Sequence, residues 1–326
     1  MTNKKALITG IAGQDGSYLA ELLLAEGFEV FGTIRRNSTP ENQENRIHHL
    51  ENHIKTFYAD LTDSSSMLKI LKDVKPTHIF NLAAQSHVRI SFEIPLYTAQ
   101  VNGIGALNFF DVINQVLPQS RVYQASSSEM FGTCIDNDGF QRETTPMMPS
   151  SPYGAAKLFA YHGAKIYRDS YNLFIANGIL FNHESPRRGS NFVTSKIVKE
   201  AVKIKAGASN SLSLGNIDAK RDWGHSKDYV KAMFKIISDD SPNDYVVATG
   251  QTRTVREFLS VVFEELKMNW EDFVIFDPKL LRPKEVPVLK GDFSKISGSL
   301  QWSPEVSFEN LVLEMIEYWS DKLNGQ

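Results

Sequence analysis

Apolar residues in the first half of the chain fall in short runs that alternate with stretches where they recur every three or four positions. Short apolar runs bounded by turn residues predict buried strands, and the longer spacing predicts amphipathic helices. The predicted strands are 6–9, 28–34, 54–59, 78–83, 121–125, 174–180 and 245–248, and the predicted helices are 17–26, 65–71, 103–116, 152–170, 194–206 and 230–237. Strands that alternate with helices indicate an α/β fold in which helices cover both faces of a doubly wound parallel sheet.

The alternation weakens after Phe181, where a polar, arginine-containing segment begins. This change predicts a smaller second lobe, and the later helix and strand at 230–237 and 245–248 indicate that the chain then returns to the first domain. We therefore expect a discontinuous division. Residues 1–181 with about 226–250 form a Rossmann-like domain, and residues 182–225 with about 251–326 form a smaller α/β lobe that binds substrate.

Three glycines, Gly10, Gly13 and Gly16, lie between the first predicted strand and the first predicted helix. In a strand-loop-helix unit such glycines let the backbone approach a pyrophosphate, and the helix offers its first amides to the phosphates. Gln14 and Asp15 belong to the same loop and are expected to contact the cofactor. The alternative is a tight turn that binds no ligand.

The end of the second predicted strand carries Arg35 and Arg36, where enzymes that prefer NAD have an acid for the ribose hydroxyl. Two guanidiniums would hold a 2'-phosphate, so NADP is the expected cofactor unless the pair is simply solvated. Further cofactor contacts are expected at the ends of the next two strands. They are Asp60 and Leu61 against the adenine, and Leu82 and Ala84 beneath the cofactor.

Tyr153 and Lys157 are four residues apart in a predicted helix that Ser151 can cap and in which Pro152 occupies the first turn. They share a helix face, so the ammonium is expected to lower the pKa of the phenol and prepare it for proton transfer. Ser127 and Glu129 follow the strand 121–125 and end at the same sheet edge. A turn hydroxyl and a solvated loop acid are the alternative roles for these two residues.

Composition narrows the classes of function. The 326 residues are 42% hydrophobic and 22% charged with a net charge of −3, which is typical of a folded globular protein. No basic run predicts nucleic-acid binding, and no apolar segment reaches the roughly 20 residues that span a bilayer. Cys134 is the sole cysteine, so neither an internal disulfide nor a cysteine-rich metal site is expected. We expect a cytoplasmic protein without a metal.

These motifs resemble the extended short-chain dehydrogenase/reductases, and longer stretches resemble the GDP-mannose 4,6-dehydratases within them. The most diagnostic stretch is Leu180-Phe-Asn-His-Glu-Ser-Pro-Arg-Arg-Gly189, and Arg221-Asp-Trp-Gly-His-Ser-Lys-Asp-Tyr229 supports it. The resemblance covers nearly the whole chain. One departure is Ser127, where that family often has threonine; the hydroxyl is kept and a methyl is lost.

The resemblance implies a lyase that converts GDP-mannose to GDP-4-keto-6-deoxymannose in deoxysugar biosynthesis, with tightly bound NADP recycled in each turnover. The C4 hydroxyl is oxidised, water is eliminated across C5 and C6, and hydride returns to C6. Tyr153 would move the C4 hydroxyl proton, Lys157 would hold the nicotinamide ribose, and Ser127 would bind the C4 oxygen. Glu129 would take the C5 proton and help the C6 hydroxyl leave.

The same resemblance implies the remaining contacts. His183 would lie at the nicotinamide end unless it is a structural histidine, and the substrate contacts would be Ser86, Glu93, Asn182, Arg187, Lys196, Arg221, Arg282 and Glu285. Each of these substrate residues, taken alone, is as readily explained by a surface ion pair. The polar segment 35–45 would cross to a neighbouring subunit of a homotetramer, although it could also be a surface loop.

Several alternatives stay open from the sequence. A GDP-heptose 4,6-dehydratase would need the same catalytic residues in a differently shaped pocket. A nucleotide-sugar 4-reductase or epimerase would need only the tyrosine, lysine and serine, so Glu129 argues for elimination. A non-catalytic NADP sensor of this fold is disfavoured because the four candidate catalytic residues are all present.

Overall fold

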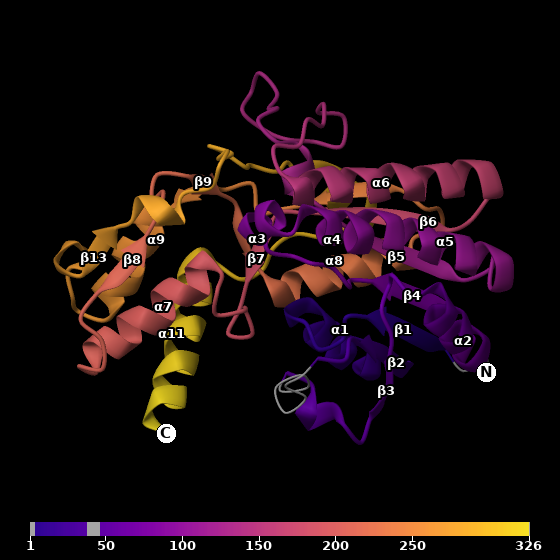
Figure 1. The fold of residues 1–326 in the computed structure, drawn as a ribbon, viewed down its shortest axis with the longest axis horizontal. Helices are drawn as coiled ribbons and strands as arrows, with labels where there is room; N and C mark the ends of the chain where they lie inside the picture. The colour runs from indigo at the N-terminus through magenta and orange to yellow at the C-terminus, as the bar shows by residue number, and fades with distance from the viewer. Residues whose placement is uncertain (1–3, 38–45, 326) are drawn as a thin grey trace.

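A seven-stranded parallel sheet forms the centre of the protein (Figure 1). The structure is a computed structural model that describes residues 4–37 and 46–325. The strand order is β11-β6-β5-β4-β1-β2-β3, which reverses direction on either side of β1 as in a doubly wound fold. The strands are β1 (Lys5–Thr9), β2 (Glu29–Ile34), β3 (Ile54–Tyr58), β4 (His78–Asn81), β5 (Arg121–Ser127), β6 (Ile175–Leu180) and β11 (Asp244–Val247). The expected fold class is confirmed.

Helices cover the sheet on both faces because each strand carries apolar residues on both sides. One core packs against α1 and α8 and includes Leu19, Leu23 and Met233, and the other packs against α2, α5 and α6 and includes Ile70 and Phe110. These helices are α1 (Gln14–Ala25), α2 (Ser64–Val74), α5 (Gly105–Val116), α6 (Pro152–Tyr171) and α8 (Ser226–Ser238). The chain of β11 hydrogen-bonds in parallel to β6, as the predicted return to the first domain requires.

A smaller lobe lies beyond the carboxyl ends of the central strands (Figure 1). Its core is formed by α7, α9 and α11 around Trp223 and Phe258. The helices of this lobe are α7 (Val193–Lys205), α9 (Val255–Glu265) and α11 (Phe308–Asn324), and its short strands are β7 (Asn182–Glu184), β8 (Leu212–Leu214), β9 (Lys220–Arg221), β10 (Trp223–His225), β12 (Arg253–Thr254) and β13 (Val274–Phe276). The short helix α10 (Ser294–Leu300) packs against β11 of the central sheet instead. The exact domain division given above stays a prediction.

Local sequence signals explain where two important elements begin. The hydroxyl of Ser151 accepts a hydrogen bond from the Gly154 amide, and Pro152 is the first residue of α6, as predicted. Gly10 has a φ of +71°, and a Cβ on Gly16 would lie 2.6 Å from the Gly10 carbonyl oxygen, so the turn from β1 into the first turn of α1 needs glycine at both positions. The helix starts three residues earlier than predicted because the loop itself forms its first turn.

The connection between β4 and α5 departs most from the prediction. It contains two short helices, α3 (Val88–Glu93) and α4 (Pro95–Ala99), and a π-helical turn, η3 (Gln100–Ile104). These segments are too short to show a helical period in sequence. Short 3-10 turns lie at η2 (His48–Leu50), η4 (Ser128–Met130), η5 (Trp270–Asp272) and η6 (Pro278–Leu280). No helix in the described ranges has the length and apolar character needed to cross a membrane.

Candidate active site

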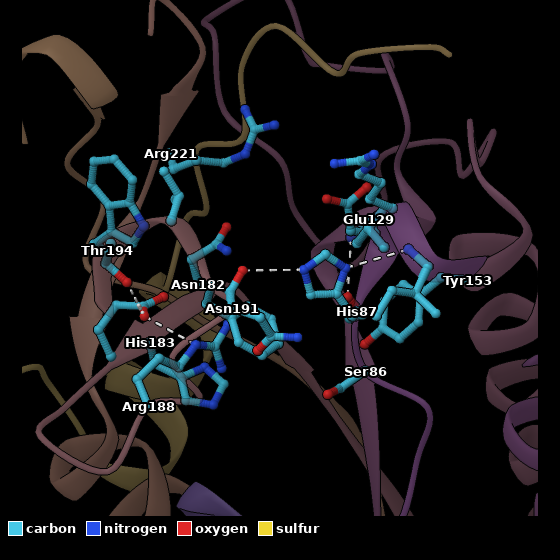
Figure 2. Close-up of a pocket in the computed structure, with 18 of the residues that line it drawn as sticks. Ser86, His87, Glu129, Tyr153, Asn182, His183, Arg188, Asn191, Thr194 and Arg221 are labelled. Carbon is cyan, nitrogen blue, oxygen red and sulfur yellow. Dashed lines mark hydrogen bonds and ion pairs between the residues drawn. The ribbon is translucent and has the colours of Figure 1, made fainter. Parts of the chain in front are cut away.

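A cleft of about 770 Å³ opens at the carboxyl edge of the central sheet, between the sheet and the smaller lobe (Figure 2). This is where open α/β sheets bind ligands. The cleft brings together fifteen of the predicted site residues, which are Asp15, Leu82, Ala84, Ser86, Glu93, Ser127, Glu129, Tyr153, Lys157, Asn182, His183, Lys196, Arg221, Arg282 and Glu285.

Tyr153 and Lys157 lie in the first two turns of α6 and are both buried. Burial raises the pKa of Tyr153 to about 12, although a hydrogen bond with Ser127 acts in the opposite direction. Burial also lowers the pKa of Lys157 to about 8, which favours the neutral amine. The Lys157 nitrogen donates to the Ala125 carbonyl at 2.8 Å and lies 5.9 Å from the centre of the Tyr153 ring.

This arrangement corrects one expectation. The predicted lowering of the phenol pKa by the ammonium is not found, because Lys157 points to the end of β5 and burial dominates the Tyr153 site.

Glu129 lies in η4, directly after β5, and is only 8% exposed. Its backbone amide donates to the Ser127 hydroxyl at 3.2 Å, which fixes the turn that directs it into the cleft. Its Oε1 atom is 3.3 Å from a terminal nitrogen of Arg282. A buried carboxylate with an arginine partner is not the solvated loop acid that the sequence left possible.

The same arginine continues a chain of charges into the smaller lobe. Arg282 also lies 3.6 Å from Glu285, and Glu285 accepts a hydrogen bond from Arg221 at 2.8 Å. The Arg221 side chain is only 7% exposed, and it also donates to the Val286 carbonyl. The burial of Arg221 distinguishes its pair with Glu285 from a surface ion pair, and the two guanidiniums of the cluster suit a diphosphate.

Asp15 and His183 form an ion pair at the floor of the cleft. The His183 Nε2 is 2.8 Å from the Asp15 carboxylate, and Nδ1 is 2.7 Å from the Phe181 carbonyl oxygen. Both ring nitrogens therefore face acceptors, which favours the imidazolium. Burial alone would lower the pKa of His183, but the charge and hydrogen bond of Asp15 outweigh it and raise that pKa. The pKa of Asp15 is lowered despite its burial, chiefly by His183.

The side chain of Gln14 is held by hydrogen bonds to the 182–185 segment. Its amide nitrogen donates to the His183 carbonyl at 3.1 Å, and its oxygen accepts from the Ser185 hydroxyl at 2.9 Å. The side chain thus ties the glycine loop to the 182–185 segment and is not free for a cofactor. No side chain of the described residues caps α1 at Gly13, so the first amides of the helix are left to a phosphate, and the loop fits a dinucleotide.

The predicted adenosine contacts lie outside the cleft. Arg35 and Arg36 follow β2 and are exposed, and the guanidinium carbon of Arg35 is 5.7 Å from the centre of the Tyr97 ring. The Asp60 carboxylate accepts hydrogen bonds from the Thr62 amide and hydroxyl. Leu61 is 4% exposed and packs in the core, and its predicted contact with the adenine face stays a prediction. Of the predicted subunit-crossing segment, residues 38–45 lie outside the described residues.

Arg187 is also placed differently from the prediction. Its guanidinium stacks 3.9 Å from the centre of the Tyr18 ring and bonds Ser17 and Glu21 on α1, away from the cleft. Its neighbour Arg188 lines the cleft instead. A turn at Ser185 sends the two side chains to opposite sides, and no signal in the sequence distinguishes between them.

The other predicted substrate contacts line the cleft, and they differ in whether their polar atoms already have partners in the protein. The Asn182 Oδ1 is buried without a hydrogen-bond partner among the described residues. Lys196 donates to the Ser213 carbonyl at 2.6 Å, and Glu93 lies 3.9 Å from Arg89. His87, Phe192 and Thr194 also line the cleft and were not predicted. No cluster of histidine, cysteine or acidic residues in 4–37 and 46–325 could hold a metal ion.

Comparisons with known proteins identify the family of this chain. The family model of GDP-mannose 4,6 dehydratase matches residues 7–315. GDP-mannose 4,6 dehydratase of Cricetulus griseus is 48% identical and covers 96% of this chain and 91% of its own length. GDP-mannose 4,6 dehydratase 2 of Arabidopsis thaliana is 50% identical and covers 96% and 86%, respectively.

Solved structures show the same fold. UDP-glucose 4-epimerase of Thermus thermophilus, in complex with NAD, has a TM-score of 0.85 and 25% identity and covers 97% of this chain and 98% of its own. The dTDP-glucose 4,6-dehydratase DesIV of Streptomyces venezuelae has a TM-score of 0.86 and 21% identity, with 98% of both chains covered. With the family model spanning most of its length and relatives near half identical, the chain belongs to the GDP-mannose 4,6-dehydratase family.

Proposed function

We propose that this protein is a hydro-lyase that converts GDP-mannose to GDP-4-keto-6-deoxymannose. The observation that carries the proposal is the position of Glu129, a buried carboxylate that lines the same cleft as Tyr153 and Lys157. Epimerisation or reduction at C4 needs a group that moves one proton at O4. Elimination across C5 and C6 needs a second acid-base group, and Glu129 supplies it.

Tyr153 and Ser127 are the groups for the C4 oxygen. Tyr153 is neutral at physiological pH because burial raises its pKa to about 12, so it can hydrogen-bond a hydroxyl before it accepts the proton. Ser127, whose hydroxyl acts to lower the pKa of this phenol, can hold the same oxygen. Lys157 orients the adjacent ribose from its position on α6. Glu129 takes the C5 proton and returns one to the departing C6 hydroxyl.

A nicotinamide dinucleotide, when bound, supplies the hydride acceptor and donor and a cationic ring that favours ionisation of the tyrosine. Gly10, Gly13, Gly16 and the first amides of α1 would hold its pyrophosphate. Related structures are described as complexes with NAD or, for RMD of Pseudomonas aeruginosa, with NADPH. We propose NADP for this chain because Arg35 and Arg36 follow β2 where an acid would otherwise select NAD.

The GDP moiety is held by the charged chain of the smaller lobe. Arg221 and Arg282 would bind the diphosphate, and Glu285 keeps their two guanidiniums in place through its contacts with both. Asn182 has a buried oxygen in reach of the same region. We further propose a cytoplasmic homotetramer.

Purified protein offered GDP-mannose, the corresponding GDP-heptose and UDP-glucose in parallel tests the substrate. Loss of water from GDP-mannose alone supports the proposal. Dehydration of the GDP-heptose alone would show that the proposed substrate is wrong and that the proposed mechanism still holds. Mass spectrometry of the nucleotide released by denaturing the protein identifies the cofactor. NAD in that extract would contradict the role given to Arg35 and Arg36.

A further inference from the structure

His87 makes a contact across the mouth of the cleft that none of the proposed chemistry uses. It lies in the loop between β4 and α3, directly before α3. Its Nε2 lies 3.3 Å from the backbone carbonyl oxygen of Asn191, which precedes α7 on the opposite side of the cleft. Its ring also packs 5.2 Å from the ring of Phe192. Figure 2 shows the dashed line from His87 to Asn191 crossing between the two walls of the pocket. We name His87, the Asn191 carbonyl and Phe192 the cleft clasp.

The β4 side of the clasp is fixed by backbone geometry. His87 is the N-cap of α3, and its Nδ1 accepts a hydrogen bond from the Ile90 amide at 3.3 Å. Because an amide can only donate, Nδ1 carries no proton, and Nε2 must be the N–H that donates to Asn191. Burial lowers the pKa of His87, which keeps this neutral tautomer.

The other side of the clasp is fixed by charge. The guanidinium of Arg188 stacks 3.7 Å from the centre of the Phe192 ring, and its Nε lies 3.0 Å from Glu184. Glu184 is buried and also accepts a hydrogen bond from Thr194 at 2.5 Å. Phe192 is thereby held between His87 and Arg188.

The proposed reaction forms an intermediate that the cleft must retain. Oxidation at C4 produces a ketone that must stay in the cleft until water has left and hydride has returned to C6. Early escape would release GDP-4-ketomannose and leave the protein with reduced nicotinamide, which balances the two electrons taken from C4. We propose that the cleft clasp retains the keto intermediate, with His87 as a positioning residue, a role that rests on the proposed function.

The test uses variants that separate the clasp from the helix cap. Asparagine is a good N-cap, so His87→Asn keeps α3 while it removes the ring and the donor to Asn191. Asn191→Ala is the matched control, because the acceptor in the clasp is a backbone carbonyl. Each purified holoenzyme is given GDP-mannose without added cofactor. Released sugar nucleotides are followed by mass spectrometry, and reduced nicotinamide on the protein by its absorbance.

Complete conversion by the wild type establishes the proposed function first, and its failure would count against that proposal alone. We then expect His87→Asn to release GDP-4-ketomannose in a fraction about tenfold above the wild type, as expected for one lost hydrogen bond and ring contact. The variant should lose activity during turnover as reduced nicotinamide accumulates, and added oxidised NADP should restore it. Asn191→Ala should keep the wild-type fraction. An unchanged fraction in His87→Asn, with only a raised KM, would overturn the clasp, as would equal release by both variants.

Discussion

The Nε2 of His183 lies 2.8 Å from the carboxylate of Asp15, although 168 positions separate the two residues in the chain. The pair joins the glycine loop, which we propose binds the cofactor, to the first strand of the smaller lobe. It is reinforced by Gln14, whose side chain bonds the His183 carbonyl. The ion pair therefore holds together parts of the site that are far apart in the sequence.

Replacing Asp15 by asparagine should destabilise the protein in a pH-dependent way. The raised pKa of His183 gives stability that is fully present below its unfolded value of 6.5 and is lost as the pH rises through the folded value. The lowered pKa of Asp15 gives stability that is present above 3.8 and is lost as the pH falls through its folded value. Urea unfolding at pH 6 should show a loss of about 2 kcal/mol that shrinks by pH 9. A loss of the same size at both pH values would contradict a charged pair.

Lys157→Met should abolish activity and yet stabilise the protein without cofactor near pH 7. Burial lowers the pKa of Lys157 to about 8 from 10.5, so the unfolded chain binds more protons between these values. Wild-type stability should therefore rise across pH 8 to 10.5. The variant lacks that rise, and its net advantage at pH 7 is about 2 kcal/mol once the lost hydrogen bond to Ala125 is subtracted. A destabilised variant would show that burial of the charged amine carries no cost in the folded protein.

Glu129→Gln should separate oxidation from elimination. The amide cannot take the C5 proton, so the dehydration rate should fall by about 10²- to 10⁴-fold while C4 is still oxidised. Rapid mixing should then show reduced nicotinamide with the ketone still bound. Glu285→Gln is the contrasting variant, because it loosens Arg221 and should raise KM with elimination intact. An equal loss of C4 oxidation and of elimination in Glu129→Gln would contradict a specific role of Glu129 in the elimination step.

The two adjacent arginines should behave differently. Arg188→Ala removes a guanidinium that lines the cleft and should weaken GDP binding, measured by calorimetry, by about tenfold. Arg187→Ala removes the stack on Tyr18 and the bond to Glu21, so it should lower the melting temperature and leave GDP affinity near the wild-type value. Weakened GDP binding in Arg187→Ala, with unchanged binding in Arg188→Ala, would support the sequence-based prediction that Arg187 contacts the substrate.

The central sheet and the grouping of the candidate catalytic residues in one cleft could be predicted because their signals are local. Alternating apolar runs, the glycine loop and the Ser151 cap each reflect interactions within a few residues. Side-chain direction in the irregular segments could not be predicted in this way. The choice between Arg187 and Arg188 depends on a turn at Ser185, and that turn depends on Gln14, far away in sequence.

The electrostatics of the site could not be predicted for a related reason. The helical spacing of Tyr153 and Lys157 was predicted correctly, but their pKa values depend on burial and on the Ala125 carbonyl. His87 was missed as well, because its partners at 191 and 192 are about one hundred residues away and carry no sequence motif with it. Long-range packing, which no local pattern encodes, decides each of these features.

Elimination through a 4-ketone is the step on which the proposed mechanism depends. Purified protein is incubated with GDP-mannose in deuterated water without added cofactor, and the sugar nucleotide is followed by mass spectrometry and NMR. We expect loss of one water and gain of one deuterium at C5, with no net use of nicotinamide. Unchanged GDP-mannose, together with reduction of a 4-keto sugar at the expense of NADPH, would contradict this mechanism and identify a reductase.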